Sequence, residues 1–261
     1  MKTHLLLSAF FLSQTSSWGA AALFEDFEDS TVGYTIHEYT SGDFGSVFTN
    51  AIGEISDIVD HSELDYYSRI TYTDAPYALS NSQGLSYFGI EDVNSAGTLS
   101  GSGVGTTYTD IALQWTNIDV SSYGTNYEFS SYFGEGDALD GNQDWDSSDS
   151  LRIFASLDGG SFTQIFGIES GATSTANVDT NFDGFGDGAE ITDMMTNYTV
   201  DLGALLGAGN TLTLQFITDG LSAENEDIAF DNVTVNQVPE PSSLMLLGLG
   251  AFGLIARRSR K

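Results

Sequence analysis

Short runs of alternating apolar and polar residues, separated by glycine-rich turns, recur along this 261-residue chain. The clearest lie at residues 111–115, 127–132 and 212–216. Because successive side chains of a strand point to opposite faces, these runs predict strands with one buried face. Further β-prone runs lie at residues 24–28, 46–52, 68–73, 85–90, 151–157, 161–166 and 228–235.

Helical signals are scarce between these runs. No stretch keeps the 3.6-residue apolar period long enough for a confident helix, and we expect only a short one around residues 191–197. The tripeptide Asp158-Gly159-Gly160 predicts a tight hairpin turn between two of the strands. Many short strands with glycine-rich turns predict an all-β domain, for which a jelly-roll-like β-sandwich is the expected architecture.

The N-terminal end has the pattern of a secretory signal peptide. Lys2 precedes an apolar run at residues 5–12 and a small-residue stretch that ends at Ala22. We therefore expect a signal peptide at residues 1–22, cleaved after Ala22, and a β-sandwich ectodomain at residues 23–237.

The C-terminal segment, residues 238–261, has three parts. The tripeptide Pro239-Glu240-Pro241 is followed by fifteen uncharged residues, 242–256. A single apolar helix of this length spans about 22 Å, whereas the hydrocarbon core of a bilayer is about 30 Å thick. Such a helix suits transient insertion and retention better than permanent anchoring. The last part is a basic cluster, which the positive-inside rule places on the cytoplasmic side: Arg257, Arg258, Arg260 and Lys261.

This three-part order resembles the PEP-CTERM sorting signal of exported bacterial proteins. The resemblance implies recognition by an exosortase-type membrane protease, cleavage near the motif, and delivery to the cell surface or extracellular matrix. An ordinary C-terminal membrane anchor is the alternative, although such anchors usually need about 20 apolar residues.

The predicted ectodomain is strongly acidic. Of the 37 Asp and Glu residues, only Glu240 lies outside it, and its only cations are Arg69 and Arg152. Nucleic acid binding is excluded as a function, because contacts with phosphates need Lys and Arg. The chain has no cysteine, so stability must come from core packing or bound metal rather than disulfides. Solubility in a salty medium is an alternative reason for the charge.

Residues 179–190 fit the twelve-position calcium loop D-x-[DN]-x-[DN]-G-x5-E throughout. Gly184 at the sixth position allows the sharp turn that the pattern needs. The expected calcium ligands are the side chains at positions 1, 3, 5, 9 and 12, with the carbonyl at position 7: Asp179, Asn181, Asp183, Asp187, Glu190 and Phe185.

The residues that precede this loop, 171–178, form a poor helix, unlike those of an EF-hand. The loop is more similar to the calcium loops of dockerin and thrombospondin type 3 sequences, which implies a structural ion rather than a switch. An acidic, glycine-rich hairpin tip without metal is the alternative. A second acidic cluster around Trp145 at residues 137–149 lacks the glycine, and we interpret it as a solvated loop with a second ion as the alternative. Glu28 and Asp231 are a further candidate pair for a cation, by analogy with other jelly rolls alone.

Residues 149–235 are similar to jelly-roll modules of secreted bacterial proteins. The similarity rests on the segment 156–163, the acidic loop, and the closing sequence Phe230-Asp231-Asn232-Val233, which galactose-binding-like and MAM-like sandwiches share. It implies a recognition or adhesion role and no catalytic residues.

The sequence contains none of the catalytic motifs G-x-S-x-G, H-E-x-x-H or the P-loop. Glu54 and Asp57 are three residues apart and so face opposite sides of a strand, unlike the paired acids of sandwich-fold endoglucanases. Trp145, Tyr66-Tyr67 and Tyr123 are candidates for rings that stack on sugars, with packing inside the domain as the alternative for each, whereas Trp115 is expected in the core.

The sequence therefore predicts an exported, surface-sorted, non-enzymatic module that is calcium-stabilised and binds glycans or mediates adhesion. An exosortase-type protease and extracellular polysaccharide are the expected partners. A secreted polysaccharide-degrading enzyme and a purely structural matrix protein are the alternatives.

Overall fold

A computed structural model describes residues 21–28, 33–39, 51–52, 66–72, 79–91, 110–136, 143–221 and 226–238. One compact unit runs from Ala21 to Val238. The predicted signal peptide up to residue 20, the segment after Val238, and the pair Glu54 and Asp57 lie outside the described residues.

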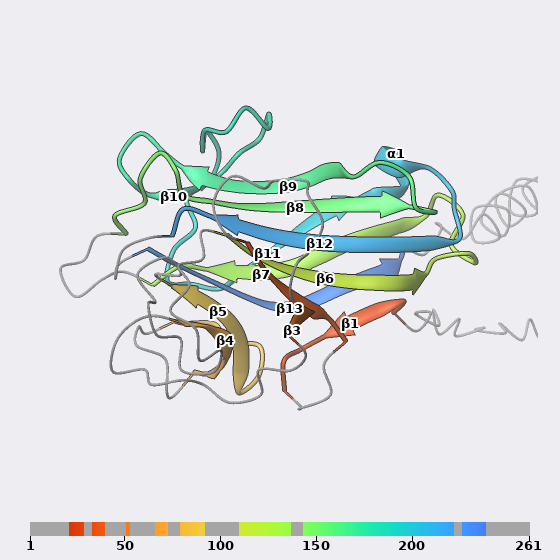
Figure 1. Ribbon diagram of the computed structural model, residues 1–261, viewed down its shortest axis with the longest axis horizontal. Helices are drawn as coiled ribbons and strands as arrows, with labels where there is room; N and C mark the ends of the chain where they lie inside the picture. The colour runs from red at the N-terminus through yellow and green to blue at the C-terminus, as the bar shows by residue number, and fades with distance from the viewer. Residues whose placement is uncertain are drawn as a thin grey trace, which may run out of the picture. The chain divides into compact units, whose positions relative to one another are not determined.

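The described strands form two antiparallel sheets that face each other (Figure 1). The smaller sheet has the order β11-β7-β13-β5-β4, and β1 pairs with β13 beside it. Its strands are β1 (Leu23–Glu25), β4 (Tyr66–Thr71), β5 (Ser86–Glu91), β7 (Tyr127–Gly134), β11 (Thr196–Asp201) and β13 (Asp227–Gln237).

The larger sheet has the order β10-β9-β8-β12-β6-β2-β3. Its strands are β2 (Thr35–Tyr39), β3 (Ala51–Ile52), β6 (Asp110–Asp119), β8 (Ser150–Leu157), β9 (Thr163–Ser170), β10 (Ala176–Val178) and β12 (Thr211–Asp219). From β5 onward the chain crosses repeatedly between the two sheets, as in a jelly roll. The all-β sandwich predicted from the sequence is confirmed.

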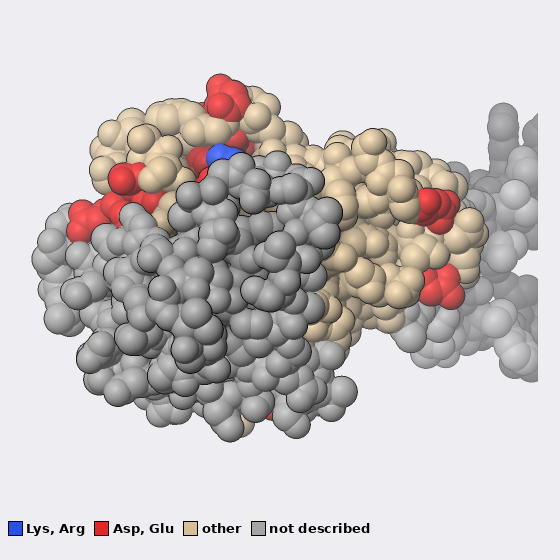
Figure 2. Space-filling model, viewed as in Figure 1, with Lys and Arg blue, Asp and Glu red and all other residues tan. Residues whose placement is uncertain are grey.

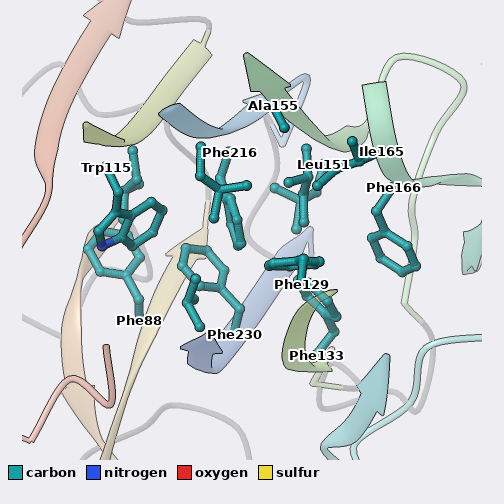
Figure 3. Packing of buried hydrophobic residues seen from close by; sticks show 14 of the residues in the cluster. Phe88, Trp115, Phe129, Phe133, Leu151, Ala155, Ile165, Phe166, Phe216 and Phe230 are labelled. Atoms are coloured by element: carbon teal, nitrogen blue, oxygen red, sulfur yellow. The ribbon is translucent and has the colours of Figure 1, made fainter. Parts of the chain in front are cut away.

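The core lies between the sheets and combines a layer of aromatic rings with aliphatic side chains (Figure 3). Phe216 of β12 lies at its centre, with ring centroids 5.0 Å from Phe230 and 5.2 Å from Trp115. Phe133 stacks on Phe166 across the sheets, with centroids 5.1 Å apart. Alternation produces this layer, because every second residue of β7 from Tyr127 to Phe133 is buried. Rings of this size, each fully removed from water, contribute about 2–3 kcal/mol apiece. A chain without cysteine can therefore be held by its core.

The predicted hairpin turn joins β8 to β9. Asp158 and Gly159 both have positive φ, at 49° and 72°, as the central residues of a type I′ turn do, and Gly160 N donates to Leu157 O at 2.9 Å. The Asp158 carboxylate also accepts hydrogen bonds from the N–H groups of Asn210 and Thr211, which ties the turn to β12.

The short helix predicted around residues 191–197 is wrong. Residues from Thr196 onward form β11, an edge strand paired with β7, and Thr199 and Val200 are β-branched residues that favour a strand there. The helix of the described residues, α1 (Leu202–Leu206), follows directly, and Asp201 caps it by accepting a hydrogen bond from Ala204 N.

Within the residues that the structure describes, no helix is long and apolar enough to cross a membrane.

Candidate functional site

The acidic loop at residues 179–190 connects β10 to the segment before β11 and lies along β9 and β10 (Figure 1). Three of its N–H groups donate to strand carbonyls: Asp179 N to Gly167 O at 2.9 Å, Gly186 N to Ser170 O at 3.0 Å, and Gly188 N to Val178 O at 2.7 Å. The loop backbone is therefore fixed to the edge of the larger sheet.

Asp179 organises the first half of the loop. Its side chain is buried, and its Oδ1 accepts hydrogen bonds from Asn181 N at 3.1 Å and Phe182 N at 2.7 Å. Its Oδ2 accepts from Gly184 N at 3.0 Å. Gly184 has φ of +85°, a conformation that glycine adopts without strain. The predicted turn at the sixth position is therefore present.

Asp187 closes the second half of the loop. Its Oδ1 accepts from both the N–H and the hydroxyl of Thr180, at 2.9 and 2.8 Å, and its Oδ2 accepts from Asn181 Nδ2 at 3.3 Å. These hydrogen bonds from Thr180 hold the pKa of Asp187 below its usual range. The two halves of the loop are thus connected by charge-assisted hydrogen bonds.

The six predicted calcium ligands are only partly gathered. Asp179, Asn181 and Asp187 are linked through the bonds described above, whereas Glu190 is exposed and forms a β-bridge with Asn177. In the described part of the chain, no three His, Cys, Asp or Glu side chains come together as a group that could hold a metal ion. The loop has the backbone turn of a calcium loop, while its carboxylates bind N–H and hydroxyl groups of the loop itself. Calcium binding by these residues stays a prediction.

An ion pair lies on the neighbouring strands. Arg152 Nε is 2.6 Å from Glu169 Oε1, and Arg152 Nη2 is 3.3 Å from Oε2, so the contact is bidentate. Glu169 is buried, which raises its pKa although the Arg152 guanidinium opposes the shift. Arg152 is the only Lys or Arg whose side chain the structure describes, and Figure 2 shows one small basic area among the acidic patches of this face.

A second acidic site lies beside Trp145. Burial raises the pKa of Asp149 to about 8, and the neighbouring carboxylates of Glu226 and Asp146 add to the shift. Asp149 is fully buried, so the interpretation of the whole cluster as a solvated loop is wrong for this residue. The cluster members Asp137, Asp140 and Asn142 lie outside the described residues.

Asp231 on β13 is also buried, and burial raises its pKa to about 7, with the charges of Glu28 and Asp26 adding to the shift. Its Oδ2 accepts a hydrogen bond from the Tyr72 hydroxyl at 3.3 Å. Glu28 instead accepts from the backbone of Ser86 at 3.0 Å. The Glu28 charge affects Asp231, as the hypothesis of a shared cation requires. Each of the two carboxylates, however, already accepts a hydrogen bond from the protein.

Two of the candidate sugar-binding residues, Trp145 and Tyr123, are buried, which is the packing alternative for them. Trp145 is fully buried and donates to Asp227 O, and Tyr123 is only 8% exposed, so neither ring is accessible to a ligand. The Tyr66 and Tyr67 side chains lie outside the described residues. Trp115 is in the core, as expected. Among the described residues, the exposed aromatic rings belong to phenylalanines that were not candidates for sugar binding: Phe24, Phe162, Phe182 and Phe185.

Comparison with known protein families indicates where the protein is located. Residues 237–261 match the model of the PEP-CTERM protein-sorting motif. The chain carries a PEP-CTERM sorting motif. This motif indicates an exported, surface-sorted protein that is held at the membrane through its C-terminal region before an exosortase, itself a membrane protein, processes it.

No curated protein matches this PEP-CTERM chain in sequence. Similar solved structures include the Stig cyclase FisC from Fischerella sp. TAU, at 12% identity and a TM-score of 0.38, covering 85% of this chain and 91% of that chain. The K3 cleaved adhesin domain of Lys-gingipain from Porphyromonas gingivalis W83 has 15% identity and a TM-score of 0.41, covering 83% and 98%. Neither similarity bears on what this chain does.

Proposed function

We propose that the β-sandwich is a non-enzymatic module that binds extracellular polysaccharide at the cell surface or in the matrix, stabilised by calcium. The proposal rests mainly on the sorting motif that follows β13, because this motif directs the sandwich to the outside of the cell. The acidity of the ectodomain supports it further, since such a surface is repelled by nucleic acids and anionic lipids but not by neutral sugars.

The calcium part of the proposal rests on the acidic loop. Gly184 and the orientation of the Asp179 carboxylate fit the turn of a calcium loop, and Asn181, Asp183 and Asp187 lie on the same loop. Glu190 is exposed at the end of the loop. An extracellular calcium loop has a Kd on the order of 10⁻⁴ to 10⁻³ M, so 10 mM calcium stabilises the folded protein by about 1.4–2.7 kcal/mol.

Two assays on the exported protein test the proposal. The first measures retention on cellulose, chitin and a soluble β-glucan in gels, with 10 mM calcium or excess chelator. The second measures reducing sugar released from the same polymers. Retention without release supports a binding module, release indicates a polysaccharide-degrading enzyme, and neither indicates a purely structural matrix protein.

A further inference from the structure

Two phenylalanine rings are exposed on the acidic loop. Phe182 and Phe185 are 44% and 47% exposed and stand three residues apart, on either side of Asp183 and Gly184. Burying such rings is favourable, so a loop that presents two of them to solvent offers apolar contact area to a partner.

The backbone holds Phe182 in an unusual conformation. Its φ is +60°, in the left-handed region that bulky residues rarely adopt. The N–H of Phe182 donates to the buried Asp179 carboxylate, and this bond fixes the conformation. Strained residues that the surrounding structure holds in place are concentrated at ligand sites. A glycine or asparagine would meet the same backbone without strain, so the loop geometry alone does not explain a phenylalanine here.

The Phe182 ring packs beside a polar side chain. A Cβ atom built on Gly167 of β9 would lie 3.8 Å from Phe182 Cδ1 and 2.9 Å from Gln164 Nε2, so one edge of the ring and the amide both cover this buried glycine. Arg152 is the cross-strand partner of Gly167 and its side chain therefore stands on the same face. Its ion pair with Glu169 uses two of the five guanidinium N–H groups.

This combination fits a sugar better than other partners. A pyranose offers an apolar C–H face to an aromatic ring and hydroxyl groups to amide, guanidinium and carboxylate groups. Nucleic acids and anionic bilayers are repelled by the carboxylates of Asp183 and Asp187 beside the rings. A loop fixed by its own hydrogen bonds loses little conformational freedom on binding.

We propose that Phe182, Phe185, Gln164 and Arg152 form a binding surface for a neutral polysaccharide, with the two rings as stacking platforms. This proposal rests on the proposed function and assigns its ligand site to the tip of the acidic loop and the adjoining face of β8 and β9.

The test compares three single variants and one double variant of the exported protein by retention on cellulose, chitin and a soluble β-glucan. Phe182→Asn removes one ring but keeps a residue that tolerates the left-handed backbone, and Phe185→Ala removes the other. Phe162→Ala is the matched control, because Phe162 is 47% exposed near the hairpin turn after β8. Thermal unfolding of each variant verifies that the fold is retained.

We expect each loop variant to bind about tenfold more weakly, as the loss of one stacking contact predicts, and Phe162→Ala to bind within about twofold of the wild type. If the wild type binds and the Phe182→Asn, Phe185→Ala double variant binds equally well, this site is wrong while the proposed function stands. Equal weakening by Phe162→Ala shows nonspecific apolar adsorption and also overturns the site. A wild type that binds no polymer, with or without calcium, overturns the polysaccharide function and the site together.

Discussion

Replacing Asp179 by asparagine separates the structural role of the acidic loop from its proposed role in binding calcium. The carboxylate accepts three backbone hydrogen bonds. The asparagine side chain has one oxygen acceptor in place of two. At the other oxygen position its NH₂ group faces a backbone N–H, so the hydrogen bond there is lost. A hydrogen bond to a charged group contributes about 1.5–3 kcal/mol. One bond lost and two weakened should therefore lower the free energy of unfolding by about 2–4 kcal/mol.

Thermal unfolding in excess chelator measures this effect. For a domain of this size each kcal/mol corresponds to roughly 2–4 °C, so Asp179→Asn should lower the melting temperature by roughly 5–15 °C. Asp183→Ala is the control, because the Asp183 side chain is exposed and its loss should cost less than about 0.5 kcal/mol without metal. A melting temperature of Asp179→Asn within about 1 °C of the wild type would refute the structural role.

Calcium then distinguishes the second role. With 10 mM calcium the wild type should gain about 1.4–2.7 kcal/mol, and Asp183→Ala, which removes the side-chain ligand, should lose most of this gain although it is unaffected in chelator. If Asp183→Ala is stabilised by calcium as much as the wild type, the ion does not bind at this loop.

Three other properties can be measured directly. Asp149 and Asp231 have raised pKa values of about 8 and about 7, so the folded state holds protons that the unfolded state releases near pH 4. Stability in chelator should be greatest below pH 4 as far as these groups are concerned, and should fall by on the order of 1 kcal/mol per group for each pH unit as the pH rises from about 4 to the folded pKa values of about 7 for Asp231 and about 8 for Asp149. Asp149→Asn should make the melting temperature less dependent on pH. An unchanged pH dependence would contradict the raised pKa of Asp149. Phe216→Ala should cost about 3–5 kcal/mol in urea unfolding, because it leaves a cavity at the centre of the aromatic layer; a loss under about 1 kcal/mol would show that the layer is loosely packed. Replacing Pro239, Glu240 and Pro241 by alanine should leave the tail on the exported protein, which mass spectrometry of the surface fraction detects, and normal processing of the variant would show that the tripeptide is not recognised.

The strands could be predicted because burial on one face leaves a period of two in the sequence. The alternation at residues 127–132 and 212–216 became β7 and β12, and the Asp-Gly signal became a turn with both residues at positive φ. The helix around residues 191–197 was predicted wrongly because its apolar residues, among them the buried Met195, pack into the sandwich from an irregular segment. Pairing with β7, which sequence periodicity does not show, decided the state of the residues that follow.

The candidate site was harder to predict for the same reason. Trp145 lies among acidic residues in the sequence, which suggested exposure, but its ring is covered by segments distant in the chain and donates to Asp227. Phe182 and Phe185 lie in an equally acidic stretch and are exposed. Local composition is similar in the two cases, so only tertiary packing separates a buried ring from an exposed one. The calcium-loop pattern did predict the turn at Gly184, because that turn depends on neighbouring residues alone.

The position of β13 sets the order of events during export. This last strand lies inside its sheet and pairs with β7 on one edge and with β5 and β1 on the other, so the sandwich cannot be completed until its final residues have left the translocation channel. Val238 N donates a hydrogen bond to Asn126 O, so the folded domain extends to the residue before Pro239. A chain retained by its tail must therefore finish folding almost at the point of retention. In the sequence, the sorting motif therefore follows the last strand of the sandwich without an intervening linker.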